Sequence, residues 1–229
     1  FTWKNYISGC RTGRHSGEAG MALNCRIEKD GSLTVSSGTA YLIRNMYPGI
    51  DGHSLHAIRI IKEENKVVWE TVHGKVACSL HEEEESFELE FSLDNYTGPI
   101  HTLHFFYQAD IRAEGFYQAA EGMGGDTGYY GKNSMLERGT IVSYGLCSLK
   151  LPGGHALTIY PVSQKHYETV CEVNARENVK YTDGSGKHST ETELSLSVGA
   201  RMENTGREQV IFERLRFLLT PSMEEGLEK

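Results

Sequence analysis

The chain has 229 residues, a formal net charge of −8, and 25 glycines against five prolines. That charge argues against nucleic acid or an anionic membrane surface as the main partner. No stretch approaches the roughly 20 apolar residues that cross a bilayer. The length suits one large all-β domain or two small ones.

The cysteines are widely spaced and none forms a C-x-x-C pair. They are Cys10, Cys25, Cys78, Cys147 and Cys171. An odd number without close pairs is typical of reduced thiols in a cytoplasmic protein, and a zinc site would need closer pairs. We therefore expect buried, unligated thiols, no metal or cofactor site, and a cytoplasmic location.

Apolar and polar residues alternate with a period of two through most of the chain, which predicts strands. In chain order these segments are 23–27 and 33–35 around an Asp30-Gly31 turn, 41–44, 56–62, 66–72, 76–80, 87–93, 103–111, 140–151, 156–162, 168–174, 194–202 and 210–220. Residues 103–111 form the longest clean alternation upstream of a glycine-rich stretch. The last segment slips phase between Phe212 and Leu215, as a bulge requires.

This pattern predicts the fold class. A dozen or more strands without a regular helix between them, and without βαβ alternation, exclude doubly wound folds and the eight-fold α/β barrel. The absence of an internal repeat disfavours propellers and solenoids. We predict an all-β, two-sheet antiparallel β-sandwich (a supersandwich) over residues 1–220. Less than about a tenth of its residues should be helical.

The end of the chain carries a helix-start signal. Ser222 and Glu225 follow Pro221 in the S-x-x-E spacing of a capping box. A helix of about two turns is marginal alone in water. We therefore interpret residues 221–229 as the start of a linker helix that leads to a downstream domain outside this chain.

Residues 115–131, which read GFYQAAEGMGGDTGYYG, show no strand alternation. Long irregular loops in compact domains are usually functional or disordered, and four aromatic side chains in a short stretch favour burial over disorder. A structural loop that only crosses the end of a sheet is the alternative. The stretch breaks the G-x-G-x-x-G pattern and lacks G-K-[ST], so it is not a nucleotide-binding loop.

The same stretch holds the candidate site residues. Sugars need flat apolar faces for their C–H surfaces and planar polar groups for their hydroxyls, and this stretch has both. We predict a substrate-binding wall made of Tyr117, Gln118, Glu121, Asp126 and Tyr129. We assign no catalytic residue, because a carboxylate pair on one glycine loop would be poorly positioned for glycoside hydrolysis.

A long strand that enters an aromatic and glycine-rich loop, with a capped helix at the end of the domain, resembles a known family. It is similar to the N-terminal β-supersandwich of clan D α-galactosidase and raffinose-synthase-like glycoside hydrolases (melibiase type, galactose-mutarotase-like fold). In that family the loop commonly carries a G-Y-Q-S-W-like motif and reaches the active site of the barrel domain. Here Gly115-Phe116-Tyr117-Gln118-Ala119-Ala120 keeps the glutamine and lacks the stacking tryptophan. Tyr117, Tyr129 or Tyr130 could replace that tryptophan.

The resemblance implies an accessory role, because the family's catalytic aspartates lie in the following barrel. The chain would shape the sugar pocket and build the oligomer. Its partners would be a galactoside-like carbohydrate, the downstream catalytic barrel domain and further copies of itself. Two alternatives stay open: a free-standing carbohydrate-binding β-sandwich, and an aldose-mutarotase-like enzyme with a histidine and a glutamate as acid and base. For the latter, the sequence has ten histidines and no privileged one.

Overall fold

The computed structural model describes residues 22–83, 86–119, 127–162, 169–181, 188–201 and 210–228. The strands are β1 (Leu23–Ile27), β2 (Leu33–Ser37), β3 (Ala40–Met46), β4 (Gly49–Ile50), β5 (His53–Ser54), β6 (Arg59–Lys62), β7 (Lys66–Thr71), β8 (Gly74–Glu82), β9 (Ser86–Asp94), β10 (Thr102–Ile111), β11 (Gly115–Gln118), β12 (Gly128–Gly131), β13 (Thr140–Tyr144), β14 (Cys147–Lys150), β15 (Ala156–Pro161), β16 (Thr169–Tyr181), β17 (His188–Arg201) and β18 (Val210–Thr220). The helices are α1 (Lys132–Arg138) and α2 (Met223–Leu227). Of the described residues, 65% are strand and 7% helix, which confirms the predicted all-β class.

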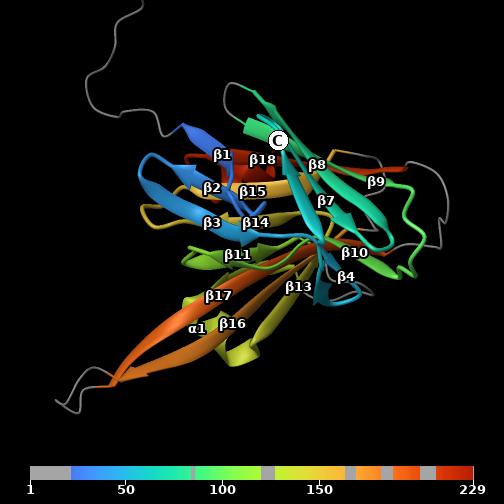
Figure 1. Ribbon diagram of the computed structural model, residues 1–229. Helices are drawn as coiled ribbons and strands as arrows, with labels where there is room; N and C mark the ends of the chain where they lie inside the picture. The colour runs from blue at the N-terminus through green and yellow to red at the C-terminus, as the bar shows by residue number, and fades with distance from the viewer. Residues whose placement is uncertain are drawn as a thin grey trace, which may run out of the picture.

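The strands form two nine-stranded sheets, and the strand pairs described in both are antiparallel. Sheet A has the order β1-β2-β3-β10-β17-β16-β13, with β4 and β5 attached beside β10. Sheet B has the order β12-β11-β14-β15-β18-β9-β8-β7-β6. Figure 1 shows the two layers, with the β16–β17 hairpin extending away from the rest of the molecule. The predicted two-sheet sandwich is therefore confirmed.

Aromatic side chains fill the space between the sheets. Phe217 of β18 stacks on Phe87 of β9, with ring centroids 4.6 Å apart and 13° between the ring planes. Phe106 of sheet A lies 6.4 Å from Phe217, and Phe105 of sheet A lies 5.0 Å from Phe91 of sheet B. Each of these rings removes a large apolar area from water, so they help to hold the two layers together.

Two local predictions are confirmed. The β1–β2 hairpin turns at Gly31, whose φ is 80°, and Asp30 Oδ1 accepts hydrogen bonds from the backbone N and the Oγ of Ser32. Strand β18 carries a register shift between Ile211 and Glu213. That shift is the bulge that the phase slip in the sequence predicts.

Two predicted strands are less regular than the sequence suggests. Residues 140–151 do not form one strand, because the chain turns at Gly145 (φ 82°) and passes from β13 in sheet A to β14 in sheet B. The prediction of a clean alternation along β10 is also wrong. Two register shifts place neighbouring Phe105 and Phe106 both in the core and leave Tyr107 half-buried.

A helix also lies where none was expected. α1 has seven residues, of which only Met135 is buried. A single buried residue does not produce the 3.6-residue apolar period by which a helix is recognised in a sequence. It ends at Gly139, whose φ is 73° and whose N–H donates to the Met135 carbonyl. A left-handed glycine at this position is a common helix stop.

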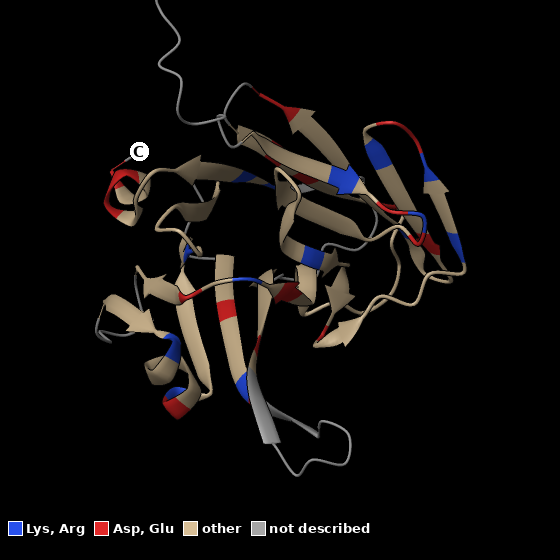
Figure 2. Ribbon diagram, turned by 90° about the vertical axis from the view of Figure 1, so that its left-hand side faces the viewer, with Lys and Arg blue, Asp and Glu red and all other residues tan. Residues whose placement is uncertain are grey.

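The helix start that the sequence predicts at Ser222 is confirmed. Ser222 is the N-cap of α2, and its Oγ accepts a hydrogen bond of 3.3 Å from the N–H of Glu225. The helix carries the acidic residues Glu224 and Glu225 in its first turn (Figure 2). It packs on the outer face of sheet B so closely that a Cβ on Gly226 would lie 2.5 Å from Thr158 Oγ1.

Four cysteines, Cys25, Cys78, Cys147 and Cys171, are free and buried, as the sequence predicts. Cys10 lies outside the described residues. Burial raises the pKa of the Cys25 thiol above its ordinary value. Within the described parts of the chain, no helix is long and apolar enough to span a membrane. The same residues contain no group of three or more His, Cys, Asp and Glu side chains arranged to hold a metal ion.

Candidate functional site

The ends of the glycine-rich stretch 115–131 are strands, which corrects the expected loop. β11 pairs with β12 on one side and with β14 on the other. Each strand has only four residues and contains glycine, so the alternation is too short and too weak to recognise in the sequence. Glu121 and Asp126 lie outside the described residues, and their predicted role in sugar binding stays a prediction.

Tyr117 and Tyr129 are brought together by this hairpin. They sit directly opposite each other in the β11–β12 register and so point to the same face of sheet B. A Cβ on Gly115 would lie 2.2 Å from Tyr129 Oη, so the Tyr129 ring lies over this glycine. Tyr129 is 49% exposed, and Lys150 Nζ lies 5.6 Å from its ring centroid. We call Tyr117, Tyr129 and Lys150 the tyrosine face.

Gln118 lies on the opposite face of the same strand. Its side chain is only 1% exposed, like that of Phe116, which precedes it by two residues. Gln118 is paired with Gly128 and Cys147, and its Nε2 has no hydrogen-bond partner in the described part of the chain. A buried donor without an acceptor is destabilising, so this amide lowers the stability of the hairpin.

A buried serine anchors the hairpin to the neighbouring turn. Ser143 Oγ accepts a hydrogen bond of 2.9 Å from the N–H of Ala119 and donates one of 2.7 Å to the carbonyl of Leu146. The segment that leaves β11 is therefore tied to the β13–β14 turn. This contact links two regions that are 24 residues apart in the sequence.

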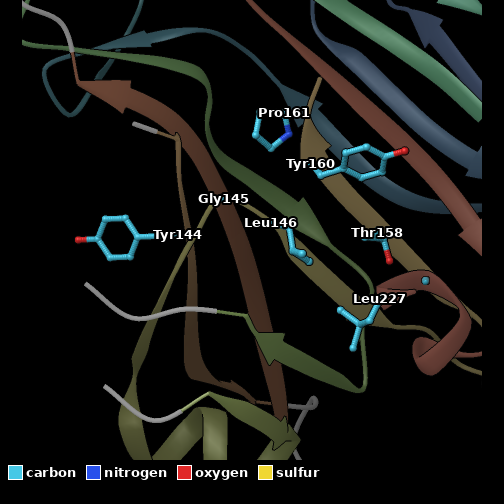
Figure 3. Close-up of a pocket in the computed structure, with 8 residues that line it drawn as sticks. Tyr144, Gly145, Leu146, Thr158, Tyr160, Pro161 and Leu227 are labelled. Carbon is cyan, nitrogen blue, oxygen red and sulfur yellow. The ribbon is translucent and has the colours of Figure 1, made fainter. Parts of the chain in front are cut away.

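That turn forms one wall of a cavity of about 240 Å³ on the outer side of sheet B. The other walls are β15 and α2. The cavity is lined by Tyr144, Gly145, Leu146, Thr158, Tyr160, Pro161, Gly226 and Leu227. In Figure 3 the rings of Tyr144 and Tyr160 point in opposite directions, and Thr158 lies near α2. Ligand pockets for drug-sized molecules start at about 300 Å³, so this volume suits a ligand of about one sugar ring.

The cavity adjoins the tyrosine face through a row of paired residues. Tyr117 is opposite Ser148 on β14, and Ser148 is opposite Thr158 on β15. The two hydroxyls are 3.0 Å apart and buried. Neighbouring strands are about 4.8 Å apart, so Tyr117 and the cavity wall are separated by about 10 Å. Local sequence patterns do not reveal this cavity, since α2 and Thr158 are far apart in the sequence and meet only in the fold.

The structure also singles out one histidine, His104 on β10. It is half-buried, and its Nδ1 has no hydrogen-bond partner among the described residues. Burial lowers the pKa of His104 below its ordinary value, although the carboxylates of Glu172 and Asp51 act in the opposite direction. The imidazole is therefore neutral near pH 7. Burial and strand geometry, which the sequence does not show, distinguish it from the other histidines whose side chains the structure describes.

This pKa shift predicts a pH dependence of stability. Between the lowered pKa of folded His104 and the unfolded value of about 6.5, the unfolded chain binds a proton that the folded chain does not. The free energy of unfolding therefore rises with pH in this window. We expect a His104→Gln variant to lose less stability than the wild type between pH 7 and pH 5 in urea unfolding. A His101→Gln control, at an exposed position, should keep the wild-type dependence. Equal pH dependence in His104→Gln and wild type would contradict the assignment.

Comparisons with known proteins add a likeness in fold. No family model matches the sequence, and no curated protein matches it either. Among solved structures, the chain is similar to the alpha-N-acetylgalactosaminidase NagBb from Bifidobacterium bifidum in complex with GalNAc, with a TM-score of 0.58 and 9% identity. That match covers 89% of this chain and 35% of that chain. The fold of this chain therefore also occurs within a glycosidase.

A second solved structure is the heparan sulfate lyase HepC from Pedobacter heparinus, with a TM-score of 0.45 and 7% identity over 82% of this chain and 30% of that chain. We draw no argument from this weaker likeness. At 9% identity, the likeness to NagBb concerns the fold alone. This chain spans about a third of the length of NagBb.

Proposed function

We propose that this chain is the N-terminal accessory domain of an α-galactosidase-like glycoside hydrolase, in which the tyrosine face shapes the sugar pocket. The observation that carries the proposal is the position of Tyr117 and Tyr129 on one outer face that adjoins a cavity of the size of one sugar ring. The fold likeness to part of a glycosidase supports it, since that likeness leaves about two thirds of the larger chain for other domains.

The chemistry of the face suits a neutral sugar. Tyrosine rings present flat apolar surfaces on which the C–H side of a pyranose can stack, and their hydroxyls remain available for hydrogen bonds. Lys150 provides a further donor next to the ring of Tyr129, and the Thr158 hydroxyl lies at the cavity wall about 10 Å from Tyr117. Glu121 and Asp126 remain part of the proposed site as ligands for sugar hydroxyls. Gln118 does not, because it is buried on the opposite face of β11 and cannot contact a sugar on the tyrosine face.

The proposal includes the partners that the resemblance implies. These are a galactoside-like carbohydrate, a downstream catalytic barrel domain and further copies of the chain. Tyr129 is exposed on an edge strand. Exposed aromatic surface of this kind often marks an interface, and we propose that a neighbouring domain or subunit covers it. The buried free thiols are consistent with the proposed cytoplasmic location.

Binding of methyl α-D-galactopyranoside, followed by NMR on the isotope-labelled chain, tests the proposal. We expect amide shifts in β11, β12 and β14, and a Tyr117→Ala variant that binds at least about ten-fold more weakly, because it loses a stacking ring. Tyr41→Ala is the matched control, since Tyr41 is a half-buried tyrosine on sheet A that contacts Arg44. Wild-type affinity in Tyr117→Ala, with the fold intact, would contradict the proposed role of the tyrosine face.

A further inference from the structure

The outer face of sheet A contains a second group of polar side chains, around a strained part of β10. This strand shifts register twice against β17, between His104 and Phe106 and between Phe106 and Ala109. Within the second shift Gln108, an exposed residue, has a φ of 51°. Left-handed backbone at a non-glycine residue is unfavourable and is often found at functional sites, and bulges often redirect side chains beside such sites.

Two hydrogen bonds hold this strained segment. The N–H of Gln108 donates to Ser197 Oγ at 2.9 Å, and Gln108 Nε2 donates to Tyr107 Oη at 3.3 Å. The ring of Tyr107 in turn contacts the ring of His104 edge-on, with centroids 5.1 Å apart. The bulges thus bring an imidazole, a phenol and a carboxamide together within five residues of one strand.

Two glycines make room for these rings. A Cβ on Gly49 would lie 2.8 Å from Tyr107 Cβ and 3.4 Å from His104 Cβ. A Cβ on Gly199 would lie 3.0 Å from His104 Nδ1. Gly199 is the residue of β17 directly opposite His104. Neighbouring strands on both sides of β10 therefore lack a side chain where His104 and Tyr107 pack.

A carboxylate lies across β17 from His104. Glu172 on β16 is opposite Ser197, two residues from Gly199 on the same face of β17. Glu172 Oε1 accepts a hydrogen bond of 2.8 Å from Asn174 Nδ2, and Asn174 Oδ1 accepts one of 2.7 Å from Thr140 Oγ1. The carboxylate is therefore held in place by a chain of neutral donors.

We infer that His104, Tyr107, Gln108, Ser197 and Glu172 form a second ligand site on sheet A, which takes a neutral, hydroxyl-rich molecule such as a single sugar or the terminal sugar of a glycan. The site offers donors and acceptors of several kinds, as vicinal hydroxyls require. The charged groups that act on His104, Asp51 and Glu172, are both acidic, which disfavours anionic ligands. The inference rests on the proposed carbohydrate role for the choice of ligand only.

The two sites lie on different sheets, so NMR distinguishes them in one experiment. We titrate labelled chain with methyl α-D-galactopyranoside and follow the His104 side-chain signals and the amides of β11 and β12. We expect His104 to shift, and His104→Gln and Glu172→Gln to weaken this binding at least about ten-fold, since each loses a hydrogen bond to the ligand. His101→Gln is the matched control and should bind as the wild type. D-Galacturonate, which is anionic, should bind more weakly than the neutral probe.

The outcomes separate this inference from the proposed function. Shifts at His104 that persist in Tyr117→Ala support the second site. Shifts confined to the tyrosine face, or wild-type affinity in both His104→Gln and Glu172→Gln, overturn it and leave the proposed function intact. Shifts at His104 without any on the tyrosine face overturn the proposed site there and support the second one. If no residue responds to the sugar, both are wrong.

Discussion

Replacing Phe217 by alanine is expected to lower the free energy of unfolding by about 3–5 kcal/mol. Phe217 is fully buried, stacks on Phe87 and contacts Phe106 of the opposite sheet. Truncation removes the packing contacts of the ring with Phe87 and Phe106 and leaves a cavity between the two sheets. The surrounding strands are hydrogen-bonded on both edges, so they relax only partly into the gap.

Urea unfolding monitored by circular dichroism measures this effect. Phe217→Leu keeps most of the side-chain volume and should lose clearly less stability than Phe217→Ala. Val72→Ala is the control for an apolar residue outside the core, because Val72 is 76% exposed and should change stability by less than about 0.5 kcal/mol. A loss below about 1 kcal/mol in Phe217→Ala would show that the rings between the sheets do not hold the layers together.

Gly74→Ala should also be strongly destabilising, by at least about 2 kcal/mol, for a different reason. Gly74 opens β8 with a φ of 138°, which side-chain-bearing residues rarely adopt. A Cβ there would lie 2.5 Å from Tyr96 Cα and 2.6 Å from the Asn95 carbonyl oxygen. Both are backbone atoms, so no rotation of a flexible side chain can relieve the clash.

Gly153→Ala separates the two contributions to that effect. Gly153 also has a left-handed φ, 93°, but a Cβ there would meet no atom within 4 Å. The Gly153→Ala variant should lose about 1 kcal/mol of unfolding free energy, because only the backbone conformation is unfavourable for alanine there. The difference between the two variants in urea unfolding then measures the clash with residues 95 and 96. Equal losses would mean that the chain near Asn95 moves freely away from the new methyl group.

Some features of the fold depend on local sequence and others on contacts between distant segments. Period-two alternation predicts most strands here, and the turn at Gly31 and the cap at Ser222 are confirmed where the sequence places them. These features depend on residues a few positions apart, through pleating, left-handed glycine and a side chain that accepts a backbone N–H. Local chemistry is sufficient for them, and so the all-β class follows from the sequence alone.

The candidate sites depend on contacts between distant segments. Tyr117 and Gln118 are neighbours in the sequence, yet pairing of β11 with β14 leaves the tyrosine half-buried on the outer face and buries the amide. The cavity exists because α2 packs on Thr158, some 70 residues upstream along the chain. His104 packs against glycines on β4 and β17 that no local pattern connects to it.

The sequence by itself therefore determined the class of the fold, its principal strands and the cap of its last helix. Tertiary structure alone decided where the chain changes sheet at Gly145, which tyrosines share a face, and what surrounds His104. The physical reason is that strand formation is encoded in the side chains of each strand. Strand order, bulges and the packing of one layer on the other arise from pairings between residues far apart in the sequence.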